Sequence, residues 1–344
     1  MSATLAIRLP NWLGDTVMAV PAVLALRRGM PDARLLLAGP WARIFAGQGL
    51  ADVLVTSPRT WTGRLRTADV VRRFGPETAV LLPNSVESAL TARYWGARRR
   101  IGFAAPGRAL LLTDGVAPPT PRLHQIDEYL CLAERCGVTA VTREPRLEPP
   151  RDGAERAEAR GLFADAAILA RGGGRRVIGV HLGAEFGPAK LWPAARVVEF
   201  CRLLAAEDAT PVLLGGPGDR PFAAAIAAEA PVASLVGRDR PELLPALLTE
   251  VDALVSGDTG VAHLAAALGT PVVALFGPTD PRLSAPRGPA AVLTRRTPCA
   301  PCFYRVCPIE HPCLAGIDAR TVRERLGALM AVRAAGRSTA EASL

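Results

Sequence analysis

The sequence predicts an α/β protein built from two Rossmann-like domains that face each other across a cleft. Short apolar runs alternate with amphipathic stretches from the first residues onward. The runs are apolar throughout, which is typical of parallel strands that helices cover on both faces. The pattern occurs twice, on either side of an irregular middle segment, and 344 residues suit two domains of ordinary size.

The first half carries the first set of alternating elements. We expect strands at 4–9, 34–38, 52–55 and 78–82, and helices at 16–29, 41–48, 85–95 and 124–136. Pro21 falls early in the first of these helices, where a missing N–H can kink the chain.

The segment from about 142 to 175 separates the two domains. It contains Pro145, Pro149 and Pro150, then a charged surface helix at 152–161, then three glycines at 172–174. We therefore expect one domain over 1–165 and a second over 166–344.

The second half repeats the alternation. We expect strands at 176–182, 211–215, 232–235, 252–255, 271–275 and 290–293, with helices at 193–207, 219–229, 241–249, 259–268 and a closing one at about 318–334. Ligands of open α/β sheets bind beyond the carboxyl ends of strands, so the loops that follow strands are the places to look for function.

Composition narrows the partners and the compartment. Aromatic residues make up only 5% of the chain, which disfavours a nucleic-acid binder built on base stacking. The net charge of +9 suits a phosphorylated substrate or an anionic membrane surface, although a solvated arginine-rich surface explains it equally well. Seven cysteines, an odd number, with neither a signal-peptide pattern nor a spanning apolar stretch predict a cytoplasmic protein. Peripheral contact with the inner face of the inner membrane stays open.

The loop after the first strand contains Gly14 and Asp15. Asp15 stands where it could cap the following helix. A carboxylate at this end of a strand could equally accept a proton from an acceptor hydroxyl.

Two further loops follow strands of the second half. The first runs from His181 to Pro193 and offers Lys190 to phosphate oxygens, or simply to solvent. It lacks the Gly-Lys-Ser/Thr ending of a Walker A loop. The second, 215–219, lacks the third glycine of the dinucleotide fingerprint and offers Asp219 as an acceptor for ribose hydroxyls.

The most informative loop is Ser256–His263. Asp258 is placed to cap a helix, and the backbone N–H groups of Thr259 and Gly260 at the first turn would bind an anion such as a diphosphate. His263 lies four residues after Thr259 and hence on the same helical face. A purely structural role for His263 stays open.

Cys299, Cys302, Cys307 and Cys313 fall within fifteen residues. Structural zinc is one interpretation, but the second pair lacks the usual short spacing. A reduced structural loop is the favoured alternative.

These motifs resemble the ADP-heptose–lipopolysaccharide heptosyltransferases of glycosyltransferase family 9. The resemblance covers essentially the whole chain, and its most specific element is Gly257-Asp258-Thr259-Gly260-x-x-His263 followed by 275–279. Leu13-Gly14-Asp15 and Lys190-x-Trp192-Pro193 support it, and the cysteine segment is similar to the heptosyltransferase II branch.

The resemblance implies a GT-B fold and an inverting, metal-independent enzyme without a cofactor. It would move heptose from ADP-L-glycero-D-manno-heptose to the inner core of lipopolysaccharide, with the first domain binding acceptor and the second binding donor. Asp15 would be the general base, while Lys190 and the N–H groups of Thr259 and Gly260 would stabilise the departing ADP. Asp258 would bind donor hydroxyls, and His263 and Asp219 would support the donor site. The stretch 184–186 lacks a hydroxyl that some members offer to phosphate.

Two alternatives remain at this point. One is another nucleotide-sugar enzyme of the same fold, such as a different glycosyltransferase or an epimerase. The other is a non-catalytic Rossmann protein that binds a nucleotide.

Overall fold

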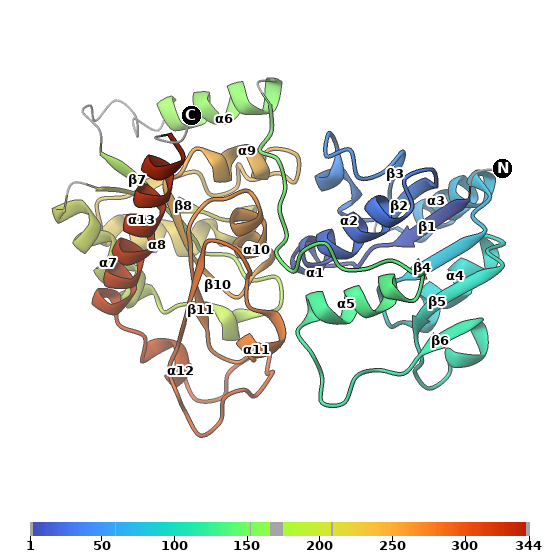
Figure 1. Cartoon of the computed structure of the whole chain (residues 1–344). Coiled ribbons are helices and arrows are strands. Elements are labelled where there is room, and N and C mark those ends of the chain that lie inside the picture. The colour runs from blue at the N-terminus through green and yellow to red at the C-terminus, as the bar shows by residue number, and fades with distance from the viewer. Residues whose placement is uncertain (1–2, 59, 152, 166–174, 208, 342–344) are drawn as a thin grey trace. The chain divides into compact units, whose positions relative to one another are not determined.

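The computed structural model describes residues 3–58, 60–151, 153–165, 175–207 and 209–341. The chain forms two compact units, the first comprising 1–147 with 282–284 and the second comprising 148–281 with 285–344 (Figure 1). By this division the helix α6 (Ala154–Asp165) belongs to the second unit, where it packs on α9 (Leu244–Thr249). The boundary that we expected at 165/166 falls directly after this helix.

The first unit contains a parallel sheet of six strands in the order β3-β2-β1-β4-β5-β6. The strands are β1 (Thr4–Arg8), β2 (Arg34–Gly39), β3 (Val53–Thr56), β4 (Thr78–Leu81), β5 (Arg99–Phe103) and β6 (Asp114–Val116). The central strands are buried almost throughout, as their continuous apolar runs predict.

Helices cover both faces of this sheet. The helices α3 (Trp61–Phe74) and α4 (Val86–Tyr94) pack small apolar side chains against one face. The other face carries α1 (Leu13–Met18), α2 (Val20–Gly29) and α5 (Gln125–Glu134). The expected helix 16–29 is interrupted at Ala19, since Pro21 in the first turn of α2 has no N–H to continue α1.

Five elements of this unit differ from the sequence prediction. The expected helix at 41–48 is only a short 3₁₀ turn, η1 (Ala42–Phe45). The strand β5 and the helix α3 were not expected, because arginines interrupt their apolar patterns, and β6 was not expected because it is only three residues long and begins with Asp114 and a glycine. A second 3₁₀ turn, η2 (Ala109–Leu111), lies between β5 and β6.

The second unit repeats the topology of the first. Its sheet order is β12-β11-β10-β7-β8-β9. The strands are β7 (Arg176–His181), β8 (Ala209–Leu214), β9 (Ala233–Ser234), β10 (Ala253–Gly257), β11 (Val272–Phe276) and β12 (Ala290–Thr294). Numbered within its own unit, each sheet reads 3-2-1-4-5-6, the order of doubly wound nucleotide-binding domains. The two sheets confirm the predicted fold class.

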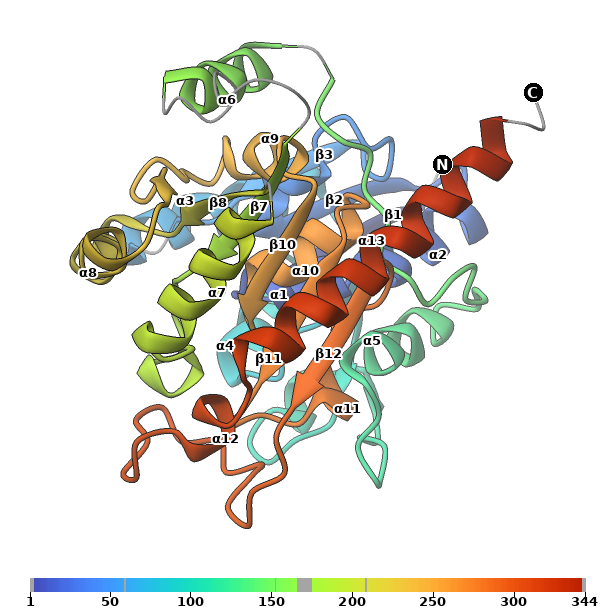
Figure 2. The same ribbon diagram turned by 90° about the vertical axis from the view of Figure 1, so that its left-hand side faces the viewer.

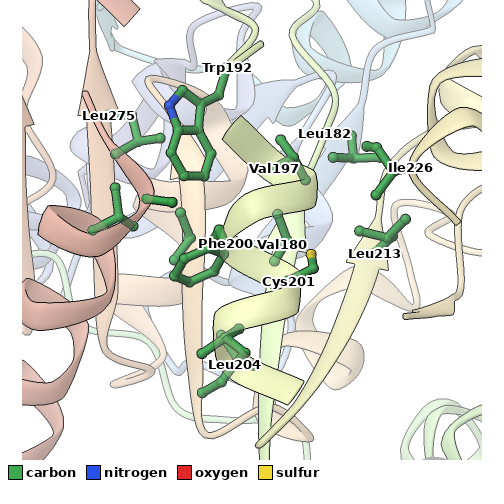
Figure 3. Close-up of a cluster of buried hydrophobic side chains, with 14 of the residues drawn as sticks. Val180, Leu182, Trp192, Val197, Phe200, Cys201, Leu204, Leu213, Ile226 and Leu275 are labelled. Atoms are coloured by element: carbon green, nitrogen blue, oxygen red, sulfur yellow. The ribbon is translucent and has the colours of Figure 1, made fainter. Parts of the chain in front are cut away.

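One face of the second sheet is covered by α7 (Ala194–Ala206), α8 (Arg220–Glu229) and α13 (Ala319–Glu341). Figure 2 shows α7 and α13 side by side across the strands. Between helix and sheet, Trp192 and Phe200 meet edge to face with ring centroids 5.8 Å apart (Figure 3). The helix α10 (Gly260–Ala267) packs on β10 and β11, while η3 (Pro188–Lys190), η4 (Pro217–Asp219), α11 (Pro281–Ser284) and α12 (Pro312–Ala315) are short turns.

The shared topology locates the functional loops. In a 3-2-1-4-5-6 sheet the chain leaves the two central strands in opposite directions, and the crevice between them binds ligand. The central strands are β1 and β4 in the first unit, and β7 and β10 in the second. Asp15 follows β1, Lys190 follows β7 and Asp258 follows β10, so all three lie at such switch points.

Candidate active site

A pocket opens at the switch point of the second unit. It is a shallow opening, and the roughly 320 Å³ of space free of protein atoms within it includes open solvent. The ends of β7 and β10 supply His181, Gly183, Ser256 and Gly257, and Lys190 lies at the same rim. Apolar side chains of the core, among them Trp192 and Leu275, form the floor.

Lys190 and Asp258 form a buried ion pair at this rim. The Lys190 Nζ lies 2.5 Å from Asp258 Oδ2 and 3.0 Å from the Asp258 carbonyl oxygen. The two side chains are only 12% and 7% exposed. Thr279, from the loop after β11, donates its hydroxyl to the same Oδ2 at 2.7 Å. Three loops that are distant in the sequence therefore meet on one carboxylate oxygen, and Asp258 Oδ1 accepts none of these bonds.

Asp258 does not cap the helix that follows it, and this part of the sequence prediction was wrong. The N-cap of α10 is Thr259, in an extended conformation, and no side chain caps the helix. The Thr259 hydroxyl instead lies 3.0 Å from that of Ser256. The leading N–H groups of a helix have no partner within the helix, so the start of α10 presents N–H groups beside the Lys190 ammonium.

The backbone packing at this point is close. A Cβ on Gly257 would lie 2.7 Å from the Lys190 carbonyl oxygen, which explains the glycine at the end of β10. His263 lies one turn further along α10 and is 5% exposed. Its part in the donor site stays a prediction.

The cysteine-rich loop is hydrogen-bonded to the Lys190 loop and to the loop after β11. The N–H groups of Cys302 and Phe303 donate to the Pro278 carbonyl at 3.0 and 2.8 Å, and the Arg305 carbonyl accepts the N–H of Ala189 at 3.0 Å. The Arg305 guanidinium and the Lys190 ammonium both lie over the Phe186 ring, at 5.4 and 4.7 Å from its centroid. The sequence analysis did not identify Arg305, because its sequence neighbours give no sign that it contacts a loop more than a hundred residues earlier in the chain.

The four cysteines of this loop are free thiols, with Cys313 buried and Cys299 exposed. In the described part of the chain, no group of three or more His, Cys, Asp or Glu side chains is arranged to hold a metal. The structure thus gives no support to a zinc site at Cys299, Cys302, Cys307 and Cys313. The loop instead holds the Lys190 loop through the contacts described above.

Asp219 lies in the turn after β8. Its Oδ2 accepts the N–H of Gly216 at 2.8 Å, and a Cβ on Gly183 or Gly215 would lie 2.8 Å from the same oxygen. Burial raises the pKa of Asp219, against the lowering effect of this bond. Burial, reinforced by the nearby Asp219, raises the pKa of Asp239 to about 6.

His181 stands at the end of β7, beside Gly183. Its Nδ1 is buried with no hydrogen-bond partner in the described part of the structure, and burial lowers its pKa to about 4. The side chain is therefore a neutral imidazole at the pocket wall. Sequence reasoning singled out neither His181 nor Asp239, since a lone histidine or aspartate in a loop carries no local signal of burial.

In the first unit, Asp15 lies in the first turn of α1 rather than at its N-cap, which is Trp12. The hydrogen bond to Glu128 chiefly raises the pKa of Arg122, and burial chiefly raises that of Tyr129; the charge of Asp15 adds to both shifts, so it lies near both residues. Arg122 in turn makes a two-pronged ion pair with the buried Glu128, at 3.0 and 2.7 Å. The half-buried Asp15 carboxylate thus lies at the switch point, near the Arg122 guanidinium, which Glu128 holds in place.

The two units provide complementary chemistry. The second offers an ammonium, helix-leading N–H groups and a carboxylate oxygen at the mouth of a pocket, an arrangement suited to a diphosphate joined to a hydroxylated group. The first offers a carboxylate at the edge of its sheet, suited to accepting a proton.

Comparison with known proteins agrees with this chemistry. The family model for glycosyltransferase family 9 (heptosyltransferase) matches residues 65–312. Lipopolysaccharide heptosyltransferase 2 of Salmonella typhimurium is 29% identical over 294 residues, covering 80% of this chain and 83% of the relative. Lipooligosaccharide heptosyltransferase 2 of Haemophilus influenzae is 27% identical, covering 83% and 86%.

The solved structure of ADP-heptose lps heptosyltransferase II from E. coli superposes with a TM-score of 0.79. The two sequences are 26% identical, and the match covers 96% of this chain and 99% of the other. The expected resemblance is confirmed across both units: the chain belongs to glycosyltransferase family 9, the heptosyltransferases.

Proposed function

We propose that this protein transfers heptose from ADP-L-glycero-D-manno-heptose to the inner core of lipopolysaccharide. The observation that carries the proposal is the Lys190–Asp258–Thr279 cluster at the mouth of the pocket in the second unit. It supplies a buried cation where a nucleotide diphosphate would leave. Membership of family 9 and the names of the relatives support heptose as the sugar.

The proposed reaction is a single displacement. The acceptor hydroxyl oxygen bonds to the anomeric carbon of the donor as its proton passes to the Asp15 carboxylate. The bond from that carbon to the diphosphate oxygen breaks, and its electron pair leaves with ADP. One displacement inverts the anomeric configuration and requires no nucleophile on the enzyme.

The departing charge is taken up by groups that are already oriented. Lys190 is fixed by Asp258, and the N–H groups of Thr259 and Gly260 lie at the start of α10. Preorganised donors of this kind stabilise charge that develops in the transition state. We propose that they do so without a metal ion or a cofactor.

The remaining residues bind the donor. Asp258 Oδ1, which takes no part in the ion pair, accepts a hydroxyl of the sugar. Asp219 accepts a ribose hydroxyl, for which a carboxylate held between two glycine backbones is well placed. His263 supports the first turn of α10 from beneath.

The acceptor is anionic and anchored in a lipid, so we propose that the enzyme works in the cytoplasm, in peripheral contact with the inner face of the inner membrane. No helix among the described residues is long and apolar enough to cross a membrane.

The test is to incubate the purified protein with ADP-heptose and a panel of truncated core acceptors, and to measure product masses. We expect the mass of one heptose to be added, with undiminished rate in EDTA. Asp15→Asn should lower the rate by roughly 10²–10⁴-fold, the usual contribution of a general base, while ADP binding persists. Transfer from UDP-sugars instead, a strict requirement for Mg²⁺, or full activity of Asp15→Asn would each contradict the proposal.

A further inference from the structure

Six of the described large apolar side chains are exposed on three elements of the first unit, α3, α4 and η2. One is Val70 on α3, with an exposed fraction of 45%. The other five are Leu65 on α3, Val86, Leu90 and Tyr94 on α4, and Leu110 in η2, with exposed fractions of 49%, 43%, 51%, 45% and 96% respectively. We call these five residues the apolar strip. The faces of α3 and α4 that pack on the sheet are already filled by small apolar residues, so the strip is additional to the core.

The elements that carry the strip contact one another. Arg64 of α3 pairs with Glu87 of α4 at 3.0 Å, and the Tyr94 hydroxyl lies 2.5 Å from Asp69 Oδ1. The Arg72 guanidinium lies over the Tyr94 ring, 5.2 Å from its centroid. On the other flank, α4 contacts η2. The helices α3 and α4 also contact each other directly.

Exposed arginines lie on the same helices or directly after them, and we call four of these the basic fringe. Arg66, Arg73, Arg93 and Arg98 are exposed and form no ion pair within the described part of the chain. The helix α3 itself carries four arginines and a single aspartate. Long arginine side chains can lie along an apolar surface while their charged ends reach a polar layer. Apolar side chains within a ring of cations are the features of a surface that binds an anionic bilayer.

The strip begins at the edge of the sheet where the proposed acceptor site lies. The elements α3, α4 and η2 follow β3, β4 and β5, and the parallel strands all end at one edge of the sheet. Val86 is the first residue of α4 and Leu65 the fifth of α3, so both lie toward this edge, where Asp15 follows β1 on the other face of the sheet. A bilayer against the strip would therefore meet the edge of the sheet at which the acceptor's sugar must be deprotonated.

We propose that the apolar strip and the basic fringe form the face by which this protein docks on an anionic membrane surface. The proposal rests on the proposed function, because a lipid-anchored acceptor explains why such a face lies at the acceptor edge. A peptide or protein partner fits less well, since a fringe of unpaired arginines matches a uniform sheet of anionic headgroups better than a mixed-charge protein surface.

The experiment is sedimentation of the full-length protein with vesicles, comparing mixed phosphatidylglycerol/phosphatidylcholine with phosphatidylcholine alone. We expect binding to the anionic vesicles that weakens as salt is added. Each arginine near an anionic surface contributes about 1 kcal/mol, or roughly five-fold in affinity. Arg66→Gln with Arg73→Gln should thus weaken binding roughly 25-fold, twice that energy.

The apolar part is tested with Leu90→Gln and Leu110→Gln together, which should lower vesicle binding by roughly ten-fold or more, given the free energy of burying even part of each side chain. Matched controls lie on α13, where Val332 is 72% exposed and Arg320 and Arg325 are also exposed. Val332→Gln, and Arg320→Gln with Arg325→Gln, should bind vesicles as the unaltered protein does.

Three results would overturn the docking proposal: no binding of the unaltered protein to anionic vesicles, binding by the strip variants at full strength, or an equal loss in the α13 controls. A concentration-dependent dimer that the strip variants abolish would assign the face to a second copy and overturn it too.

Transfer to a delipidated, water-soluble core acceptor separates this proposal from the proposed function. The strip variants should retain that activity while losing vesicle binding. A protein that binds vesicles through the strip but transfers no heptose to either acceptor would refute the function and leave the docking face standing.

Discussion

Replacing Lys190 by methionine should destabilise the second unit and abolish donor binding, for one electrostatic reason. The substitution leaves the Asp258 carboxylate, which is 7% exposed, without its cation 2.5 Å away. Removing one partner of a buried ion pair typically costs about 3–5 kcal/mol, because the other charge stays buried. Lys190 keeps part of its surface in solvent, so we expect the lower end, ~3 kcal/mol.

Asp258→Leu should cost a similar amount, since it leaves the ammonium unpaired and removes the acceptor of the Thr279 hydroxyl. The double variant removes both charges. It should be closer in stability to the unaltered protein than either single variant, which corresponds to a coupling free energy of about 2 kcal/mol or more.

The assay is urea unfolding of the four proteins, followed by hydrogen exchange of peptides from β10 and α10, since two units need not unfold together. ADP binding is measured by calorimetry on the folded proteins, and all three variants should lose it. Single-variant costs that simply add, with a coupling below about 0.5 kcal/mol, would refute a direct ion pair. Retained ADP binding in Lys190→Met would refute its role at the leaving group.

Two further predictions concern pH and the Lys190 loop. Burial lowers the pKa of His181 from 6.5 to about 4, so this residue makes stability rise with pH over that interval, whereas the Asp239 pKa, raised from 3.8 to about 6, makes stability fall there. The two effects offset one another in the unaltered protein. The melting temperature of Asp239→Asn should therefore rise between pH 4 and 6.5, and that of His181→Gln should fall over the same range. Melting-temperature profiles that neither substitution changes would disprove this account. Gly187→Ala should cost activity and on the order of 1–3 kcal/mol of loop stability, because Gly187 has a φ of 146° and a Cβ there would lie 2.5 Å from the Arg305 carbonyl oxygen. Gly161→Ala is the control, with nothing within 4 Å of the added carbon, and equal activity of the two variants would contradict the prediction.

The sequence alone determined the fold class and the loops that matter. Strands such as β1, β10 and β11 are buried on both faces, and a strand of that kind must be apolar at every position, which is visible without knowledge of its neighbours. The missing N–H of Pro21 marked where the expected helix 16–29 could bend, but the interruption at Ala19 was decided only in the folded chain.

Elements near the sheet edge escaped prediction because their stability depends on distant partners. The strand β5 begins with two arginines, and Arg99 is held by Asp114 at 2.6 Å. Its parallel pairing with β6 engages the backbone N–H and C=O groups of β5 whatever the charges on these side chains. No periodicity within five residues reveals a partner fifteen positions away.

The tertiary structure alone decided what the loop residues do. The sequence named Lys190 and Asp258 separately and expected a helix cap from Asp258. Folding brought them together across 68 positions, since β7 and β10 are neighbours in the sheet. Periodicity and capping are properties of adjacent residues, whereas an ion pair needs two side chains at one point in space, and that coincidence is fixed only by the order of the strands.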